Sequence, residues 1–231
     1  MYSPSNNYEF DVPARWSRSK ASRQLTIYDD NLKIMYNGLG LNDDDAATLI
    51  TSSPFRPTMG VGYFEIYIIE DGCDNGFESL ENSIHISNSF IMFTEIIHSL
   101  RKIGVGFGTA RTSVRQLPGW FPGSYGYHGD DGNLFHSQFY GTPYSTTYGK
   151  GDIIGCCIDY YTRTVFFTKN GINLGIAFKN IPLCRFYPMV GLRYPGQMVE
   201  ANFGKSPFAF DIQLYKSSAC QKRNVQKINE I

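Results

Sequence analysis

Short apolar runs alternate with glycine, proline and asparagine turns along most of the sequence, and this pattern predicts β-strands. The run Val61–Ile69 shows it clearly, because every second residue from Tyr63 onward falls on the same face of the predicted strand. The other predicted strands are Leu25–Tyr28, Leu32–Tyr36, Ile103–Phe107, Asp152–Tyr160, Thr164–Thr168, Ile172–Phe178, Tyr187–Arg193 and Val199–Phe203. Strands this short, at this spacing, are typical of a β-sandwich or a barrel.

Two turns predict how neighbouring strands connect. Asn170-Gly171 lies between two apolar runs, and both residues tolerate the positive φ that a type I′ hairpin turn requires. Pro195-Gly196 has the residues that turns prefer and separates the last two predicted strands. The Asp152–Tyr160 run is apolar at most positions, so we expect both of its faces to be buried.

The stretch Cys73–Lys102 has a different composition. Its apolar residues recur three or four apart, as on the buried stripe of a helix. They are Phe90, Phe93, Ile97 and Leu100. Three interpretations stay open: an amphipathic helix that docks on a partner, a helix packed against the sandwich, or a disordered insertion.

Composition and charge narrow the classes of protein. The 21 basic and 21 acidic side chains give a net charge of zero, which predicts neither a nucleic acid nor a membrane as partner. No apolar run approaches the roughly 18 residues of a membrane span, and the polar start lacks the apolar core of a secretory signal. Five cysteines at irregular spacing favour a reducing compartment, so we expect a cytoplasmic or nuclear protein. Adjacent Cys156 and Cys157 should point to opposite faces of one strand.

One cluster of polar residues invites a catalytic or metal-binding interpretation. His128 stands beside Asp130 and Asp131, but apart from His136 no further ligand follows at a suitable spacing. We therefore expect the two aspartates to accept backbone N–H bonds in a glycine turn. The acidic run Asp43–Asp45 lacks the spaced glycine and distal glutamate of a calcium loop, so it predicts a solvated loop.

Glycines and tyrosines in the same region also have two interpretations. The third of Gly104, Gly106 and Gly108 comes too early for a phosphate-binding loop, so the three glycines indicate a close approach of backbones within a strand. Tyr125 and Tyr127 share one face of a strand, where they could stack on a ligand. Aromatic pairs on a sheet face are more often core residues.

Several segments resemble the SPRY domain, specifically that of Ran-binding protein M and its relatives. These segments are Leu117–Trp120, Ser124–Gly132, Gly151–Cys156, Phe166–Gly171, Leu174–Phe178, Tyr187–Leu192, Ala201–Gly204 and Phe208–Ile212. The resemblance implies an all-β, SPRY-type antiparallel β-sandwich of the concanavalin-like jelly-roll kind over residues 13–212. Residues 1–12 would then be a polar tail and 213–231 a basic tail that could begin a helix.

Two departures from the family pattern affect this domain division. In the family, the strand ending at Glu70 turns almost at once into the strand beginning at Ile103. Here residues 73–102 intervene, either as a helical or lineage-specific insertion or as a translated intron. Ran-binding protein M also continues into LisH, CTLH and CRA helical segments, and whether these follow Ile231 in a longer product stays open.

The resemblance further implies a function. SPRY domains of this type are non-enzymatic modules that need no cofactor or metal and bind short peptide motifs of other proteins through loops at one end of the sandwich. Ran-binding protein M does so as an adaptor subunit of the CTLH/GID ubiquitin ligase. The positions that match the peptide-binding loops are Arg115, Leu117, Trp120, Phe121, Arg193 and Tyr194. We expect Trp120 and Tyr194 to be apolar anchors and the arginines to pair with acidic groups, although Trp120 could equally be core.

Two other functions stay open from sequence alone. A carbohydrate-binding or glycosidase-like sandwich would share the aromatic loops, and a glycosidase would need two carboxylates facing each other across a cleft. Asp130 and Asp159 are candidates, but no sequence feature pairs them. A secreted SPRY effector would need a signal peptide, which the first residues do not resemble.

Overall fold

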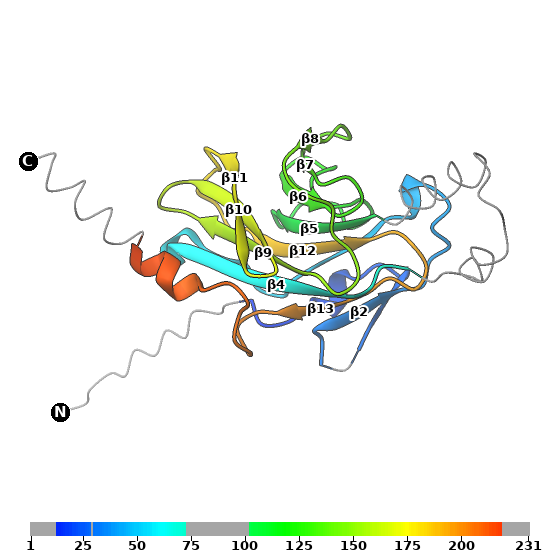
Figure 1. Ribbon diagram of the computed structural model, residues 1–231. Coiled ribbons are helices and arrows are strands. Elements are labelled where there is room, and N and C mark those ends of the chain that lie inside the picture. Colours follow the sequence, from blue (N-terminus) through cyan, green and yellow to red (C-terminus); the bar gives the residue numbers. More distant parts are fainter. Residues whose placement is uncertain (1–12, 29, 73–101, 219–231) are drawn as a thin grey trace, which may run out of the picture.

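The described residues form two stacked antiparallel sheets. The computed structural model describes residues 13–28, 30–72 and 102–218 (Figure 1). The seven-stranded larger sheet has the order β1-β2-β13-β4-β9-β10-β11, and the six-stranded smaller sheet has the order β3-β12-β5-β6-β7-β8. This arrangement confirms the predicted all-β sandwich.

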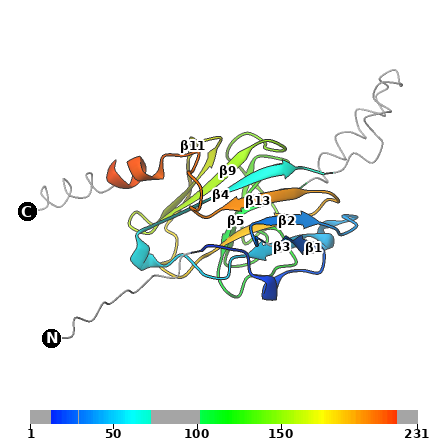
Figure 2. The ribbon, with the colours of Figure 1, turned by 90° about the horizontal axis from the view of Figure 1, so that it is seen from below.

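The larger sheet consists of strands that the hydrophobic pattern predicts. They are β1 (Leu25–Ile27), β2 (Lys33–Tyr36), β13 (Met198–Asn202), β4 (Val61–Glu70), β9 (Ile153–Asp159), β10 (Thr164–Lys169) and β11 (Ile172–Lys179). Each agrees with its predicted range to within one residue at either end. Figure 2 shows β2, β13, β4 and β9 lying side by side in this sheet.

The smaller sheet is only partly predictable. Its strands are β3 (Ala47–Ile50), β12 (Tyr187–Leu192), β5 (Ile103–Gly108), β6 (Ser124–His128), β7 (Asn133–His136) and β8 (Thr142–Pro143). The pattern predicts β5 and β12 and places Tyr125 and Tyr127 on a strand, but it does not identify β3, β7 or β8. Short 3-10 helices lie at Arg18–Lys20 (η1), Asp43–Asp45 (η2) and Pro57–Met59 (η3).

The core lies between the sheets and is rich in aromatic side chains. Tyr125 and Tyr127 are buried in it, as predicted, and the Tyr125 ring stacks on Phe107 with ring centroids 4.8 Å apart. The glycines of β5 allow the neighbouring strands to approach. A Cβ at Gly106 would lie 1.9 Å from the carbonyl oxygen of Tyr125, which confirms the predicted close backbone approach at this glycine, whereas the nearest atoms at Gly104 and Gly108 belong to side chains.

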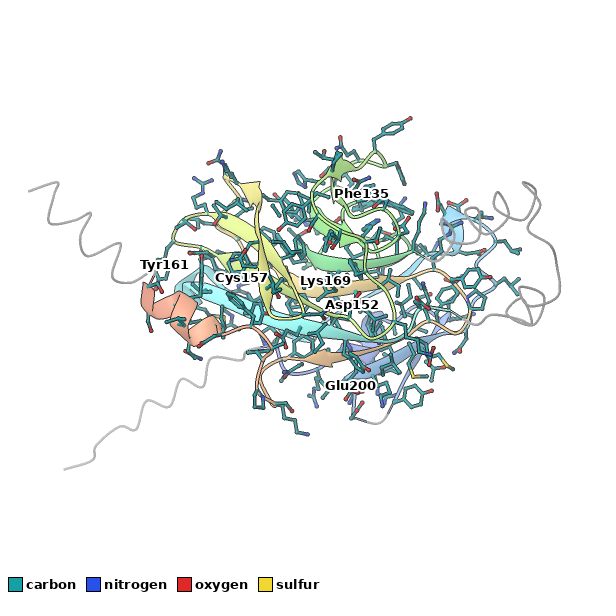
Figure 3. The ribbon with its side chains drawn as sticks, in the orientation of Figure 1. Phe135, Asp152, Cys157, Tyr161, Lys169 and Glu200 are labelled. Carbon is teal, nitrogen blue, oxygen red and sulfur yellow. The ribbon has the colours of Figure 1, made fainter. Side chains whose placement is uncertain are left out.

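Strand β9 is buried on both faces, as predicted. Cys156 belongs to the core between the sheets, whereas Cys157 packs on the opposite face with Val61, Phe166 and Ile212 (Figure 3). The two thiols therefore point in opposite directions. Burial raises the pKa of both well above the usual value for cysteine, so neither forms a reactive thiolate at neutral pH.

The predicted hairpin turn is confirmed. Lys169 pairs with Ile172, and the two residues between them have positive φ values of 51° for Asn170 and 79° for Gly171. The Asn170 side chain ties this turn to β9, because it accepts a hydrogen bond from the Ile153 amide at 2.8 Å and donates one to Asp152 at 2.8 Å.

The last described segment crosses the outer face of the larger sheet. Phe208 and Phe210 pack against Tyr63 with ring centroids 4.9 and 5.6 Å away, and residues 212–218 are helical. Buried Glu65 holds this segment, since its carboxylate accepts hydrogen bonds from the Ala209 amide at 3.0 Å and the Phe210 amide at 3.1 Å. The polar tail 1–12, the stripe Phe90–Leu100 and residues 219–231 lie outside the described residues.

Candidate functional site

Two leucine side chains in the loop that joins β2 to β3 are exposed to solvent. Leu39 and Leu41 are 74% and 73% exposed. The Asp45 carboxylate accepts the Leu41 amide at 2.7 Å, and the Tyr36 hydroxyl donates to the Asp45 carbonyl at 2.6 Å. These contacts fix the backbone beneath the leucines, so their exposure belongs to a defined loop conformation.

This loop packs directly on the turn between β12 and β13. Gly40 has a φ of 68°, and a Cβ there would lie 2.6 Å from the Arg193 carbonyl oxygen and 2.8 Å from Pro195 Cδ. The turn itself forms as predicted, with a Gly196 φ of 79° and a hydrogen bond from the Gln197 amide to the Tyr194 carbonyl. Leu39, Leu41 and half-buried Tyr194 therefore belong to one continuous surface.

Charged side chains link the loop between β2 and β3 to the turn between β12 and β13. Arg193 donates to Asp43 at 2.8 Å and to the Asn42 carbonyl at 3.0 Å, and its side chain is only 4% exposed. Lys102 approaches the same Asp43 carboxylate at 3.4 Å. Asp43 is exposed, as predicted for a solvated acidic segment, and its carboxylate also contacts two cations.

The loop between β5 and β6 lies alongside, across β3. Thr48 of β3 bonds to it twice, by its amide to the Val114 carbonyl at 2.8 Å and by its hydroxyl to the Gln116 carbonyl at 2.7 Å. Arg115, between these two carbonyls, is exposed. We call residues 38–45, 114–117 and 193–197 the end-loop cluster.

The structure brings only some of the predicted binding residues to this surface. Arg115 and Tyr194 lie on it. Leu117 and Trp120 were expected among the contact residues, but they are 1% and 4% exposed and pack with Ala46 and Phe135 over the outer face of the smaller sheet. Because they are buried, they do not contact a ligand directly in this conformation. Of the two interpretations of Trp120, exposed anchor or core residue, the structure supports the core residue.

Two further predicted contacts lie apart from the exposed part of this surface. Arg193 was expected to offer its guanidinium to a ligand, but that group is buried and already paired with Asp43. Half-buried Phe121 lies at the start of β6, where its carbonyl accepts the Ser124 hydroxyl at 2.6 Å, and this is the opposite end of the strand from His128. Leu39 and Leu41 were not predicted as contacts. The sequence signal that could have identified them is a pair of leucines flanking a glycine in a predicted loop.

His128 and its neighbouring aspartates are structural. The His128 ring is buried, stacks on Phe135 with ring centroids 4.0 Å apart, and bonds through Nε2 to the Pro118 carbonyl at 2.8 Å. Since a carbonyl only accepts, Nε2 carries the proton. Asp131 accepts the Asn133 amide at 2.9 Å, as predicted. Oδ1 of Asp130 is buried with no hydrogen-bond partner among the described residues.

These groups predict a measurable pH dependence. Burial lowers the pKa of His128 to about 4, whereas the unfolded chain binds the proton at about 6.5. The contribution of His128 to folding stability is therefore complete above pH 6.5, and we expect about 3 kcal/mol of it to be lost as the pH falls from about 6.5 to 4. NMR titration of the His128 ring protons checks this directly. A midpoint near 6.5 in the folded protein would contradict it.

Asp130 supplies the control, because its ionisation changes the folding stability with pH in the opposite direction to that of His128. Burial and the nearby Asp131 carboxylate raise the pKa of Asp130 to about 6, so its neutral form favours the folded state and adds stability as the pH falls. Asp130→Asn removes this opposing effect. In that variant we expect a steeper loss of unfolding free energy between pH 6 and 4 than in the unmodified protein.

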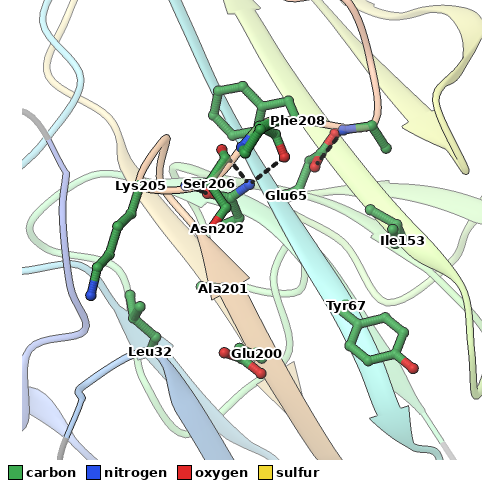
Figure 4. Close-up of a pocket in the computed structure, with 12 residues that line it drawn as sticks. Leu32, Glu65, Tyr67, Ile153, Glu200, Ala201, Asn202, Lys205, Ser206 and Phe208 are labelled. Carbon is green, nitrogen blue, oxygen red and sulfur yellow. Dashed lines mark hydrogen bonds between the residues drawn. The ribbon is translucent and has the colours of Figure 1, made fainter.

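A hollow of about 400 Å³ lies on the outer face of the larger sheet, under residues 205–209 (Figure 4). Its carboxylates already have partners: Glu65 accepts the Ala209 and Phe210 amides, and Glu200 lies 3.7 Å from Lys33. The Asn202 side chain closes the hollow by donating to the Ser206 and Pro207 carbonyls at 3.0 and 3.2 Å. The two carboxylates in this hollow, Glu65 and Glu200, are therefore engaged in structural contacts.

The carboxylates considered for a glycosidase are not placed as a pair. Asp159 pairs with Val61 at the start of β4, whereas Asp130 follows the end of β6, where His128 pairs with Gly104 at the start of β5. Asp130 and Asp159 therefore lie at opposite ends of the sandwich. Asp159 is fully buried and accepts the Tyr161 amide at 2.8 Å and the Tyr215 hydroxyl at 3.0 Å. The two carboxylates therefore do not face each other across a cleft.

Residues 13–28, 30–72 and 102–218 contain neither a metal cluster nor a membrane-spanning helix. Within them, no three His, Cys, Asp or Glu side chains are grouped so as to hold a metal ion. The helical segments in the same part of the chain are too short or too polar to cross a lipid bilayer.

Comparison with known proteins identifies the domain. A family model of the SPRY domain matches residues 92–206. Ran-binding protein 10 of Danio rerio is 37% identical over 94% of this chain, and Ran-binding protein 9 of Xenopus laevis is 40% identical over 88%. The Ran-binding protein M homolog of Arabidopsis thaliana is 30% identical over 88%. The chain spans 32%, 32% and 37% of these three proteins, or about a third of their length.

Solved structures agree on the fold. A crystal structure of a human SPRY domain superposes with a TM-score of 0.57 at 24% identity, covering 80% of this chain and 98% of the other. The SPRY domain of human HERC1 gives a TM-score of 0.58 at 18% identity, covering 83% and 99%. The chain therefore belongs to the SPRY domain family, and within it resembles Ran-binding proteins 9, 10 and M.

Proposed function

We propose that this SPRY domain is a non-enzymatic adaptor that binds a short linear segment of another protein on its end-loop cluster. One observation carries the proposal: Leu39 and Leu41 are about three-quarters exposed on a backbone that Asp45, Arg193 and Gly40 hold in place. An apolar surface that is already ordered loses little conformational entropy on binding, which is how a small contact area reaches useful affinity.

The surroundings of the leucines suggest the kind of segment bound. Tyr194 adds an aromatic side chain, a type enriched at binding hot spots. Arg115 is exposed on the neighbouring loop and could pair with a carboxylate of the ligand. We therefore propose a peptide with an acidic residue near its start and an amide-rich or apolar continuation. Arg193 then acts as a positioning residue, because it orients the 38–45 loop without reaching the ligand.

The test begins with an array of twelve-residue peptides that start with Asp or Glu and continue with Asn, Gln or apolar residues. We expect hits, and we expect the double variant Leu41→Ser/Tyr194→Ser to bind the best of them at least about tenfold more weakly by calorimetry. Leu214→Ser is the matched control, since Leu214 is 65% exposed on the helical segment 212–218. Equal affinity of the double variant and the unmodified chain would remove the end-loop cluster as the site.

On the resemblance to Ran-binding protein M, we extend the proposal to the whole protein: the bound segment belongs to a substrate that is delivered to a CTLH/GID-type ubiquitin ligase. The ligase would be joined through segments outside this chain. In cells that express a full-length relative, we expect Leu41→Ser/Tyr194→Ser introduced at the matching positions to reduce ubiquitination of the captured protein while leaving ligase assembly unchanged.

A further inference from the structure

The net charge of zero hides an uneven distribution of acidic side chains along the chain. Four long stretches carry basic side chains and no acidic ones: residues 13–28, 47–64, 103–129 and 180–199. Mixed charge is the usual pattern for a neutral surface, because it limits repulsion between like charges. A one-sign surface in a neutral protein therefore suggests attraction to a partner of opposite sign.

Parts of these four stretches meet at one end of the smaller sheet, where β3 and β5 end and β12 begins, whereas Arg115 and Arg193 lie at the opposite end. Gly108 of β5 pairs with Tyr187 of β12. The Phe55 and Phe186 backbones bridge beside them, and the Ser52 amide donates to the Arg15 carbonyl at 3.1 Å. This end is opposite to the end-loop cluster, because Leu192 and Ile103 pair at the other extremity of β12.

Four cations are exposed here. They are Arg15, Lys20, Arg111 and Arg185, which we call the cationic end. None of them takes part in an ion pair with another described residue. Asp159, in the larger sheet nearby, is fully buried and engaged with Tyr161 and Tyr215. Among the described residues, Asp159 is therefore not available to neutralise the cationic end.

A further cation, Arg56, lies at the same end. Nε of Arg56 is buried and has no hydrogen-bond partner among the described residues. Buried donors are paired in the great majority of cases, and an unpaired charged donor is unusually costly. Leu183, 59% exposed and two residues before Arg185, adds an apolar contact next to the charges.

We propose that the cationic end is a second docking surface, which binds an Asp- and Glu-rich segment of a partner protein. A single-stranded nucleic acid fits less well. Such ligands stack on open aromatic faces. The ring of Tyr187 is covered by the Lys20 ammonium, 5.3 Å from its centroid.

Fluorescence anisotropy with a fluorescein-labelled octaglutamate peptide tests the proposal on the full 231-residue chain. We expect binding at 50 mM salt that weakens at least about tenfold at 300 mM, as screening requires. Arg185→Glu should weaken binding at 50 mM at least about tenfold, with the thermal midpoint unchanged because this side chain is exposed.

The matched control is Lys205→Glu, which reverses an exposed cation outside both the cationic end and the end-loop cluster and should leave octaglutamate binding unchanged. Loss of binding in Lys205→Glu but not in Arg185→Glu would move the site away from the cationic end and overturn the proposal. So would tighter binding of a twelve-nucleotide oligothymidylate or of anionic vesicles than of octaglutamate, or no octaglutamate binding at 50 mM salt. The peptide-array hits of the end-loop cluster do not depend on this outcome.

Discussion

Gly106→Ala is expected to destabilise the domain by about 3 kcal/mol or more, a large part of the total stability of a domain this size. Gly106 sits in β5 between β6 and β12, and the added methyl carbon would lie 1.9 Å from the Tyr125 carbonyl oxygen and 2.9 Å from Gly126 Cα. Both obstacles are backbone atoms of a paired strand. Relief therefore requires the strands to separate. Urea unfolding followed by tryptophan fluorescence measures the loss.

Gly151→Ala is the matched control, because it tests the other reason for a glycine. Gly151 has a φ of 88° and open space within 4 Å of the would-be Cβ. Its substitution meets only the left-handed backbone penalty, which is about 1–2 kcal/mol. If Gly106→Ala cost no more than Gly151→Ala, close backbone packing would not be what requires a glycine in β5.

Glu65→Leu should release the segment 203–218 from the larger sheet and cost about 2–4 kcal/mol. The substitution leaves the Ala209 and Phe210 amides without their acceptor and removes a 2.9 Å hydrogen bond from the Tyr63 hydroxyl. Hydrogen bonds to a charged group contribute about 1.5–3 kcal/mol each, and part of this is offset because a buried charge is also removed. Hydrogen exchange should show lost protection in residues 203–218 before any loss in β5 or β12.

Glu200→Leu provides the comparison on the adjacent strand. Glu200 pairs with Tyr67 across β13 and β4, and its carboxylate is 41% exposed at 3.7 Å from Lys33. An exposed ion pair of this kind is worth less than about 1 kcal/mol, so exchange of residues 203–218 should not change. Equal protection in Glu65→Leu and the unmodified protein would show that the aromatic contacts alone hold the segment.

The larger sheet could be predicted from the sequence almost strand by strand, whereas the smaller sheet could not. Strands such as β4 and β9 are long or uniformly apolar, so their pattern is clear. β3 is four residues long and buried throughout, which leaves no alternation to detect. β8 has two residues and includes Pro143. Such strands exist only because a neighbour pairs with them, and that information is not local.

The candidate site shows the same limit more sharply. Arg193 looks like an exposed loop arginine in the sequence, but its partner Asp43 lies 150 positions earlier in the chain. Trp120 looks like an anchor, but the 109–123 loop folds back over the outer face of the smaller sheet and buries it. Local patterns identify which loops carry unusual residues. Only the packing of distant loops decides which side chains face the solvent.

The pairing of β2 with β13 has a consequence for how the chain is made on the ribosome. Lys33 of β2 lies opposite Glu200 of β13. The larger sheet is therefore incomplete until a strand about 165 residues later in the chain has been synthesised. At about 5–20 residues per second, β2 and β4 spend on the order of ten seconds or more with one edge each unpaired. Unpaired edges invite association between chains. We expect nascent chains that stall before Met198 to engage chaperones, and those that stall well beyond Asn202 to be released.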